Sequence, residues 1–142
     1  MTLQMRPPIT APEVIAPFVA AAVAVLLVGL LKEPARRNLS AILLGGAGAA
    51  YLGGGLGFWE VAFCIVMTVV AYLGLRDYRW IGLGWLMHSS ADVAHHLWGN
   101  PILPMLPLSS FGCALCDIGL AVWCFAKAPS PYPWVRAARV AA

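Results

Sequence analysis

Charged residues are scarce in this 142-residue sequence, which has nine lysines and arginines and six aspartates and glutamates, or 11% charged residues. An average soluble domain carries about 25% charged residues. Because 61% of the residues are hydrophobic, too little polar surface remains to cover a water-exposed globule of this size. The composition therefore argues against a soluble enzyme, a disordered regulator and a disulfide-stapled secreted domain. It favours a polytopic membrane protein.

Long apolar runs predict an all-α fold, a bundle of five membrane-spanning helices in a single domain covering residues 1–142. A membrane-spanning helix needs roughly 17–25 residues. The predicted spans are residues 13–31, 39–54, 58–75, 81–98 and 109–127. The stretch 39–75 is too long for one span, and the glycines between positions 53 and 57 provide the turn that divides it.

The basic residues favour one orientation in the membrane. They follow the first, third and fifth spans, whereas the connections after the second and fourth spans contain none. The residues concerned are Lys32, Arg36, Arg37, Arg76, Arg79, Lys127, Arg136 and Arg139. By the positive-inside rule, this alternation predicts an N-terminus outside the cell membrane and a C-terminus in the cytoplasm. Arg6 is the one basic residue that argues for the opposite orientation.

The same distribution bears on two further points. We expect the first span to remain in the protein, because its basic residues follow the apolar run instead of preceding it as in a signal peptide. The net charge of +3 is explained by the predicted cytoplasmic loops, so no nucleic-acid partner is expected. The expected partners are the lipid bilayer, a lipophilic small molecule and a second copy of the chain.

Six ionisable side chains lie inside the predicted spans. They are Glu60 in the third, His88, Asp92, His95 and His96 in the fourth, and Asp117 in the fifth. A charge at the bilayer centre costs roughly 2.5–3.5 kcal/mol. Because of this cost, ionisable side chains inside a membrane need hydrogen-bonding or charged partners, or a bound ion.

Helical periodicity places the polar groups of the fourth span on one face. His88, Asp92 and His95 fall within an arc of about 60°. Asp117 and Glu60 each lie on the polar face of their own helix. If the polar faces of all three helices point into the bundle, these groups converge in its outer half.

Such a cluster fits a divalent metal site, because imidazole and carboxylate are common ligands of zinc and iron. Copper becomes a candidate metal if Cys113 or Cys116 also serves as a ligand. The predicted metal ligands are His88, Asp92, His95, His96, Asp117 and Glu60, and the predicted catalytic residues are His88, Asp92 and Asp117. A hydrogen-bonded network that only holds the helices in register is the alternative. Haem fits poorly, because bis-histidine ligation across two helices needs a histidine on each helix, and only the fourth span contains histidine. The remaining haem options are a single axial histidine or a haem shared between two copies of the chain.

Two other features lie near this cluster. Cys113 and Cys116 have the spacing of a thiol-redox pair, although buried cysteine more often packs as a small apolar residue and no second loop pair is present to relay electrons. Residues 99–107 have proline at every third position, which predicts an extended segment. That segment either covers the cluster or simply connects two spans.

The fourth and fifth spans also carry a combined motif. It reads Asp92-x-x-His95-His96-x-x-Gly99-Asn100-Pro101, then Ser109-Ser110-x-Gly112-Cys113-x-x-Cys116-Asp117, then Ala128-Pro129-Ser130. Over about residues 85–130 the chain resembles a family of short bacterial integral membrane proteins known only as a domain of unknown function. The resemblance implies the membrane of a bacterium as the location and adds no mechanism.

The residues favour a membrane enzyme that acts on a lipophilic small molecule by metal-assisted or His/Asp acid–base chemistry, of hydrolase or isomerase type. The alternatives are a conduit for metal ions or protons, a thiol-redox protein using Cys113 and Cys116, and a structural subunit of a larger complex. A conduit needs polar residues through the inner half of the bundle as well. The predicted spans contain few there beyond Thr68, which favours a closed pocket.

Overall fold

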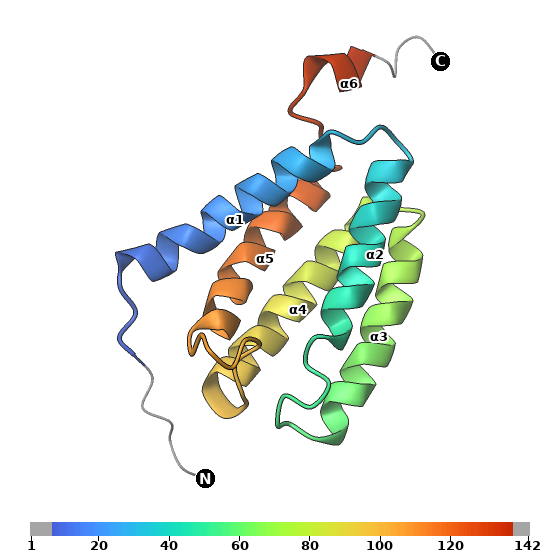
Figure 1. Ribbon diagram of the computed structural model, residues 1–142. Coiled ribbons are helices and arrows are strands. Elements are labelled where there is room, and N and C mark those ends of the chain that lie inside the picture. The colour runs from blue at the N-terminus through green and yellow to red at the C-terminus, as the bar shows by residue number, and fades with distance from the viewer. Residues whose placement is uncertain (1–6, 138–142) are drawn as a thin grey trace.

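The computed structural model describes residues 7–137, and this part of the chain folds into helices joined by short connections (Figure 1). The helices are α1 (Ala11–Gly29), α2 (Ala35–Ala49), α3 (Phe58–Gly74), α4 (Tyr78–Trp98), α5 (Ser109–Phe125) and the short α6 (Pro133–Ala137). Residues 7–137 contain no strand, so the predicted all-α fold class is confirmed. Arg6 and Arg139, which entered the orientation argument, lie outside the described residues.

The helix bounds follow from local sequence signals. In α1, Pro12 lies in the first turn, where the missing N–H is not needed, and Thr10 forms a capping box with Glu13. The second helix differs most from the expected range 39–54, because it begins at Ala35 and ends at Ala49. After it the backbone turns through the glycine-rich residues 53–57, three of which have positive φ, as the sequence predicted.

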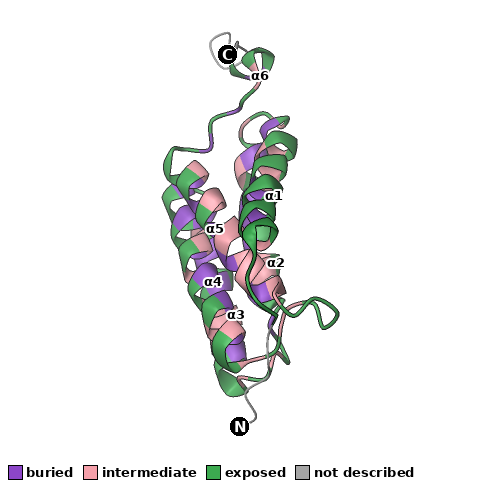
Figure 2. Cartoon of the chain, turned by 90° about the vertical axis from the view of Figure 1, so that its left-hand side faces the viewer, coloured by how far each residue is buried: buried purple, intermediate pink, exposed green. Residues whose placement is uncertain are grey.

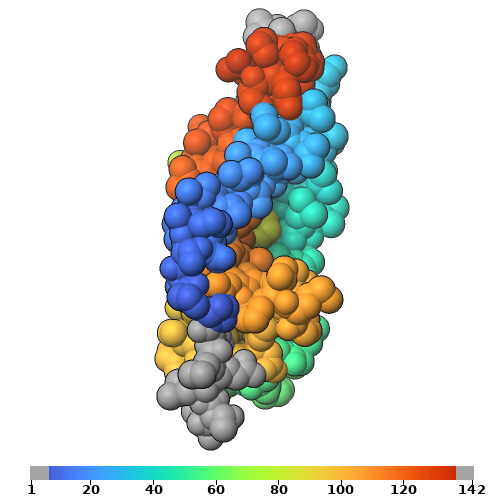
Figure 3. All heavy atoms as spheres, turned by 60° about the vertical axis from the view of Figure 1, so that its left-hand side comes forward, coloured from blue at the N-terminus to red at the C-terminus, as the bar shows by residue number. Residues whose placement is uncertain are grey.

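Helix α4 lies at the centre of the arrangement. Its interface with α5 is the most extensive, it also packs on α3 and α2, and α1 lies on α5 (Figures 1 and 3). We call the end with the α2–α3 and α4–α5 connections the lower end, and the end with the α1–α2 and α3–α4 connections the upper end (Figure 1). All three histidines therefore lie on the helix with the most extensive interhelical contacts.

An apolar core separates the two ends of α2, α3 and α4. Leu44, Met67 and Ile81 are fully buried in it. The helices approach closely because two glycines face this core: a Cβ at Gly84 would lie 2.3 Å from Leu44, and one at Gly48 would lie 2.4 Å from Met67. Glycine at these positions is therefore required by packing.

The outer surface of the bundle is strongly apolar. Large hydrophobic side chains are exposed along all five long helices, whereas several polar side chains are buried between them. Figure 2 shows buried and exposed positions along the helices in purple and green. Among the described helices, α1 alone is long and apolar enough to cross a membrane, and only 6% of its most apolar 18-residue window is buried. Helices α3 and α5 are apolar but have 17 residues each. One candidate membrane helix is thus identified by length and composition, and the five-span arrangement stays a prediction.

Candidate functional site

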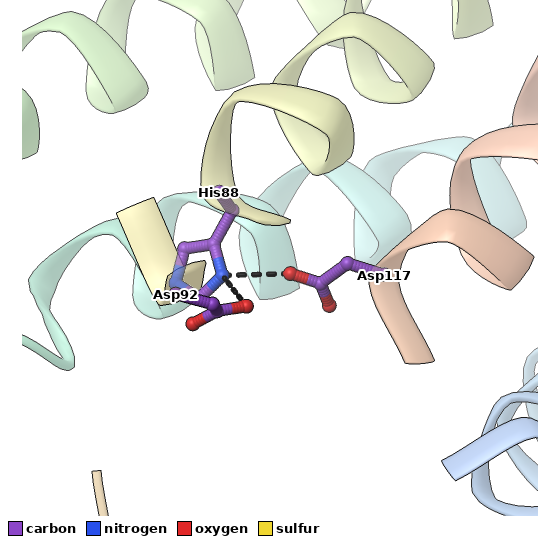
Figure 4. Close-up of side chains that lie close together, drawn as sticks. All are labelled: His88, Asp92 and Asp117. Atoms are coloured by element: carbon purple, nitrogen blue, oxygen red, sulfur yellow. Dashed lines mark hydrogen bonds and ion pairs between the residues drawn. The ribbon is translucent and has the colours of Figure 1, made fainter. Parts of the chain in front are cut away.

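His88 and Asp92 of α4 and Asp117 of α5 form a compact, buried group, which we call the triad (Figure 4). The Nδ1 atom of His88 lies 2.7 Å from Asp117 Oδ2 and 3.3 Å from Asp92 Oδ2. All three residues are less than 5% exposed. One ligand atom from each lies within 4.8 Å of the others, so the three atoms could hold one metal ion.

The second ring nitrogen of His88 fixes the orientation of the imidazole. Nε2 lies 2.9 Å from the carbonyl oxygen of Ala47, and because a carbonyl only accepts, Nε2 carries the hydrogen. Nδ1 is thereby turned toward the two carboxylates. A histidine whose outer N–H is held by a backbone carbonyl is the usual arrangement at protein metal sites.

Tyr51 is the nearest neighbour of the triad that sequence reasoning missed. It is 2% exposed and donates a 2.5 Å hydrogen bond to Asp92 Oδ1. Asp92 Oδ2 is left without a hydrogen bond and faces His88. The tyrosine therefore determines which oxygen of Asp92 belongs to the triad.

Glu60 and His95, which were predicted as ligands, form a separate pair at the lower end. Glu60 accepts backbone hydrogen bonds of 2.8, 3.0 and 2.7 Å from Gly53, Gly54 and Leu56. One of its oxygens also lies 3.3 Å from His95 Nε2. These contacts use the carboxylate to hold the glycine-rich turn.

His95 supports Tyr51 from the opposite side. The two rings stack with centroids 3.5 Å apart and planes inclined by 10°. His95 Nδ1 lies 2.8 Å from the carbonyl oxygen of Ala91, so both ring nitrogens have partners away from the triad. The ring lies tightly between two glycines, since a Cβ at Gly54 or Gly99 would lie 2.9 Å from it.

His96, also predicted as a ligand, is half-buried, and its ring lies 5.6 Å from that of Phe111 on α5. The structure does not bring it into the triad. Ligand roles for His95, His96 and Glu60 stay predictions.

The four cysteines are free thiols. Cys113 and Cys116 are half-buried on α5, within electrostatic range of Asp92 and Asp117. They lie near the triad and are not among its ligand atoms.

The connection between α4 and α5 forms bends and turns instead of the extended segment expected for residues 99–107. Side chains at the start of α5 cause this folding: Ser109 and Ser110 accept hydrogen bonds from the backbone N–H groups of Leu103 and Ile102. Asn100 N also donates to the Gly54 carbonyl at 2.8 Å, which joins the two lower connections. The expectation of a polyproline-like strand was therefore wrong, because serine side chains drew the backbone into turns.

Three cavities surround this region. The polar cavity, of about 510 Å³, lies between the two lower connections and is lined by Tyr51, Asn100 and their neighbours. The apolar cavity, of about 650 Å³, lies between α1, α5 and residues 103–109, and both Cys113 and Cys116 line it. The α3–α4 cavity, of about 450 Å³, is lined by Glu60, His95 and apolar side chains. The triad lines none of them.

The upper end contains a second buried polar group that sequence reasoning placed in a loop. Arg36 lies in the first turn of α2, is 3% exposed and forms a 2.9 Å ion pair with Glu33. Tyr78 donates a 2.8 Å hydrogen bond to the same glutamate oxygen. The sequence signal was the i, i+3 spacing of the oppositely charged Glu33 and Arg36, of which Glu33 lies in the turn that precedes α2.

Comparison with known proteins places the chain in a family. Residues 12–130 match the family described as "Family of unknown function (DUF6010)". The chain belongs to this family. The match agrees with the expected membership of a family of unknown function, and it covers nearly all of α1 and the whole of α2 to α5 of this DUF6010 member. No curated protein and no solved structure matches the chain.

Proposed function

We propose that this DUF6010 member is an integral membrane protein whose five long helices cross the bilayer, with the lower end outside and the upper end in the cytoplasm. The apolar outer surface and the buried polar groups support this, because a soluble protein has the reverse distribution. A helix of 17 residues is about 25 Å long, close to the hydrocarbon thickness of about 30 Å. The described basic residues that mark the orientation lie at or beyond the upper ends of the helices.

Within this membrane domain, the triad binds one divalent metal ion, with zinc or iron as the first candidates. His88 Nδ1, Asp92 Oδ2 and Asp117 Oδ2 supply the ligand atoms. One nitrogen and two oxygens suit either metal. Copper would need a thiol, and the candidates are Cys113 and Cys116, which both interact electrostatically with Asp92 and Asp117.

The observation that carries this proposal is the charge of the triad at its depth of burial. With both carboxyl groups ionised, the triad carries a charge of about −2 when His88 is neutral and about −1 when it is protonated. Neutrality then requires either a proton on a carboxyl group or a bound cation. An uncompensated charge in a site less than 5% exposed is costly. A divalent cation brings the total to zero.

The chemistry that we propose is hydrolysis or isomerisation of a lipophilic small molecule. A metal ion with three protein ligands keeps an open position, at which it activates water or polarises a carbonyl or epoxide. The apolar cavity suits such a substrate by its volume and lining. Cys113 and Cys116 line it and also neighbour the aspartates of the triad, so the substrate would approach from this side.

A conduit for protons or metal ions is the second candidate, and the Tyr51–Asp92–His88–Asp117 chain of contacts favours it. A conduit needs a polar path to the upper end as well. The fully buried Leu44, Met67 and Ile81 lie between the triad and the upper end. They favour a closed site over a conduit.

Metal analysis of detergent-purified protein tests the site. We expect about one zinc or iron ion per folded chain, and loss of that ion in the double variant His88→Ala with Asp92→Ala. The matched control is Glu33→Gln, which alters a carboxylate that also accepts from a tyrosine, at the upper end. Wild-type protein that takes up no ion after incubation with zinc or iron would sink the metal proposal.

The reaction is tested with the protein in lipid vesicles and a panel of lipophilic esters, lactones and epoxides. We expect turnover that requires the metal and is abolished by Asp117→Asn. Turnover that survives Asp117→Asn would exclude the triad as the catalytic site. Metal-dependent transport with no turnover would favour the conduit.

A further inference from the structure

Tyr51 occupies a position that its role as a hydrogen-bond donor does not by itself explain. It lies below α2 in the connection to α3, with its hydroxyl on Asp92 and its ring beside His88, at a centroid distance of 5.7 Å. Its other face stacks on His95. The side chain therefore lies between the triad and the lower end of the bundle.

The polar cavity meets the triad at this side chain. Among the residues that line the cavity, Tyr51 alone has a described hydrogen bond to a member of the triad. The rest of the lining comes from residues 50–54 and 100–107, which contribute backbone groups, Asn100 and prolines. This lining is more polar than that of the other two cavities.

We propose that the polar cavity is the entrance through which a divalent cation reaches the triad, and that Tyr51 controls its exchange. The inference rests on the proposed metal site and adds to it a route and a controlling residue. In the closed arrangement the tyrosine hydroxyl holds Asp92 Oδ1. For an ion to enter or leave, the tyrosine side chain has to turn away and release Asp92.

The other two cavities suit a cation less well. The apolar cavity offers mainly apolar side chains, so an ion entering there would lose its water without replacement ligands. In the α3–α4 cavity the polar side chains are Glu60 and His95, whose atoms already hold the glycine-rich turn and each other. The route past Tyr51 passes polar groups over more of its length.

The contacts around Tyr51 make its movement slow. Its ring is stacked on His95, and His95 is fixed in turn by Glu60 and by the close approach of Gly54. Asn100 ties the second lower connection to Gly54 through a backbone hydrogen bond. Opening therefore requires the lower connections to move together, which gives a barrier to metal loss.

The experiment measures how fast Co²⁺-loaded protein in detergent loses its ion to excess EDTA, together with the equilibrium affinity for Co²⁺. For Tyr51→Phe we expect the rate of loss to rise and the affinity to fall, each by about 10–100-fold, as when an outer-shell partner of a metal ligand is removed. Tyr78→Phe is the matched control, because it removes a buried tyrosine–carboxylate hydrogen bond at the upper end. It should lower thermal stability without changing either metal measurement.

A second pair of variants tests the route without touching the triad. Ala50→Phe adds bulk to the polar cavity, and Ala20→Phe adds similar bulk to the apolar cavity. We expect Ala50→Phe to slow both uptake and loss of Co²⁺ by about 10-fold with little change in affinity, since it narrows the entrance only. Ala20→Phe should change neither rate.

Four outcomes are distinguishable. Wild-type protein that binds no Co²⁺ refutes the proposed metal site itself. If Tyr51→Phe binds Co²⁺ with the wild-type affinity and loses it at the wild-type rate, the proposed role of the tyrosine is overturned. Slower exchange in Ala20→Phe but not in Ala50→Phe overturns the route. If Tyr51→Phe fails to fold, the alanine pair still decides between the two cavities.

Discussion

The upper and lower ends of the bundle each bury a tyrosine that donates to a carboxylate, and they differ in the charge that surrounds that carboxylate. At the upper end Tyr78 donates to Glu33 at 2.8 Å, and Arg36 pairs with the same glutamate at 2.9 Å. One permanent cation faces one carboxylate. This group is neutral without any further ligand.

At the lower end Tyr51 donates to Asp92, and the cationic partner is replaced by His88, which faces a second carboxylate, Asp117. Two acids share one imidazole that is not permanently charged. The comparison teaches that burial and hydrogen bonding alone do not mark a ligand site. We propose that an excess of acidic over cationic groups does, and of the two groups compared that excess lies in the one formed by Tyr51 and the triad.

The largest expected effect comes from the double variant His88→Ala with Asp117→Asn. His88→Ala removes one ligand atom and Asp117→Asn removes the negative charge of another, so we expect the affinity for zinc to fall by more than about 100-fold, beyond the 10–100-fold typical of outer-shell changes. Competition with a zinc-binding dye measures it. Glu33→Gln should leave the affinity unchanged, and equal losses in both variants would erase the distinction between the two ends.

The next effect is one of stability at the upper end. Arg36→Met leaves the partly buried Glu33 without its cation, so we expect the free energy of unfolding to fall by about 1–3 kcal/mol. Reversible denaturation in mixed micelles measures this. Metal affinity should stay at the wild-type value, and a large loss of affinity would mean that the two ends are coupled.

A smaller effect on metal affinity distinguishes a glycine at the lower end from a glycine at the upper end. Gly54→Ala places a Cβ 2.9 Å from the His95 ring, which supports Tyr51, so we expect metal affinity to fall by about 10-fold. Gly74→Ala places one 2.6 Å from Ile81 and should cost about 1–3 kcal/mol of stability with no change in affinity. The comparison fails if Gly74→Ala also weakens metal binding.

The smallest effect is expected for His96→Ala. Its ring lies against Phe111 and not in the triad, so zinc affinity should change by less than about 2-fold. Removal of a direct ligand lowers the affinity far more. The same dye competition resolves this difference. A loss comparable to that of His88→Ala would restore His96 to the ligand set predicted from the sequence.

The sequence predicted that His88, Asp92 and Asp117 lie together, but within a larger set that also contained Glu60, His95 and His96. The i, i+4 spacing puts His88 and Asp92 on one face of a helix, and the scarcity of other acids in the fifth predicted span left Asp117 as their partner. The helices that carry them follow from apolar runs bounded by glycine, proline and charge. These are local signals.

The rest depends on contacts between distant segments. Tyr51 reaches Asp92 only because the turn after α2 folds back, and that fold is held by the backbone hydrogen bonds to Glu60. An acidic residue in the first turn of a helix commonly stabilises that end of the helix. This role of Glu60 could therefore be predicted from the sequence. Arg36 was assigned to a loop because a basic residue after an apolar run normally marks a helix end. Only Tyr78, which comes from α4, meets the Glu33–Arg36 pair from a distant part of the chain.

Residues 101–107 form a shared wall, since they contribute side chains to the polar cavity on one side and to the apolar cavity on the other. Pro107 lines both. Because the two compartments share this wall, we expect a change in the length of this one connection to alter both volumes while leaving the triad unchanged.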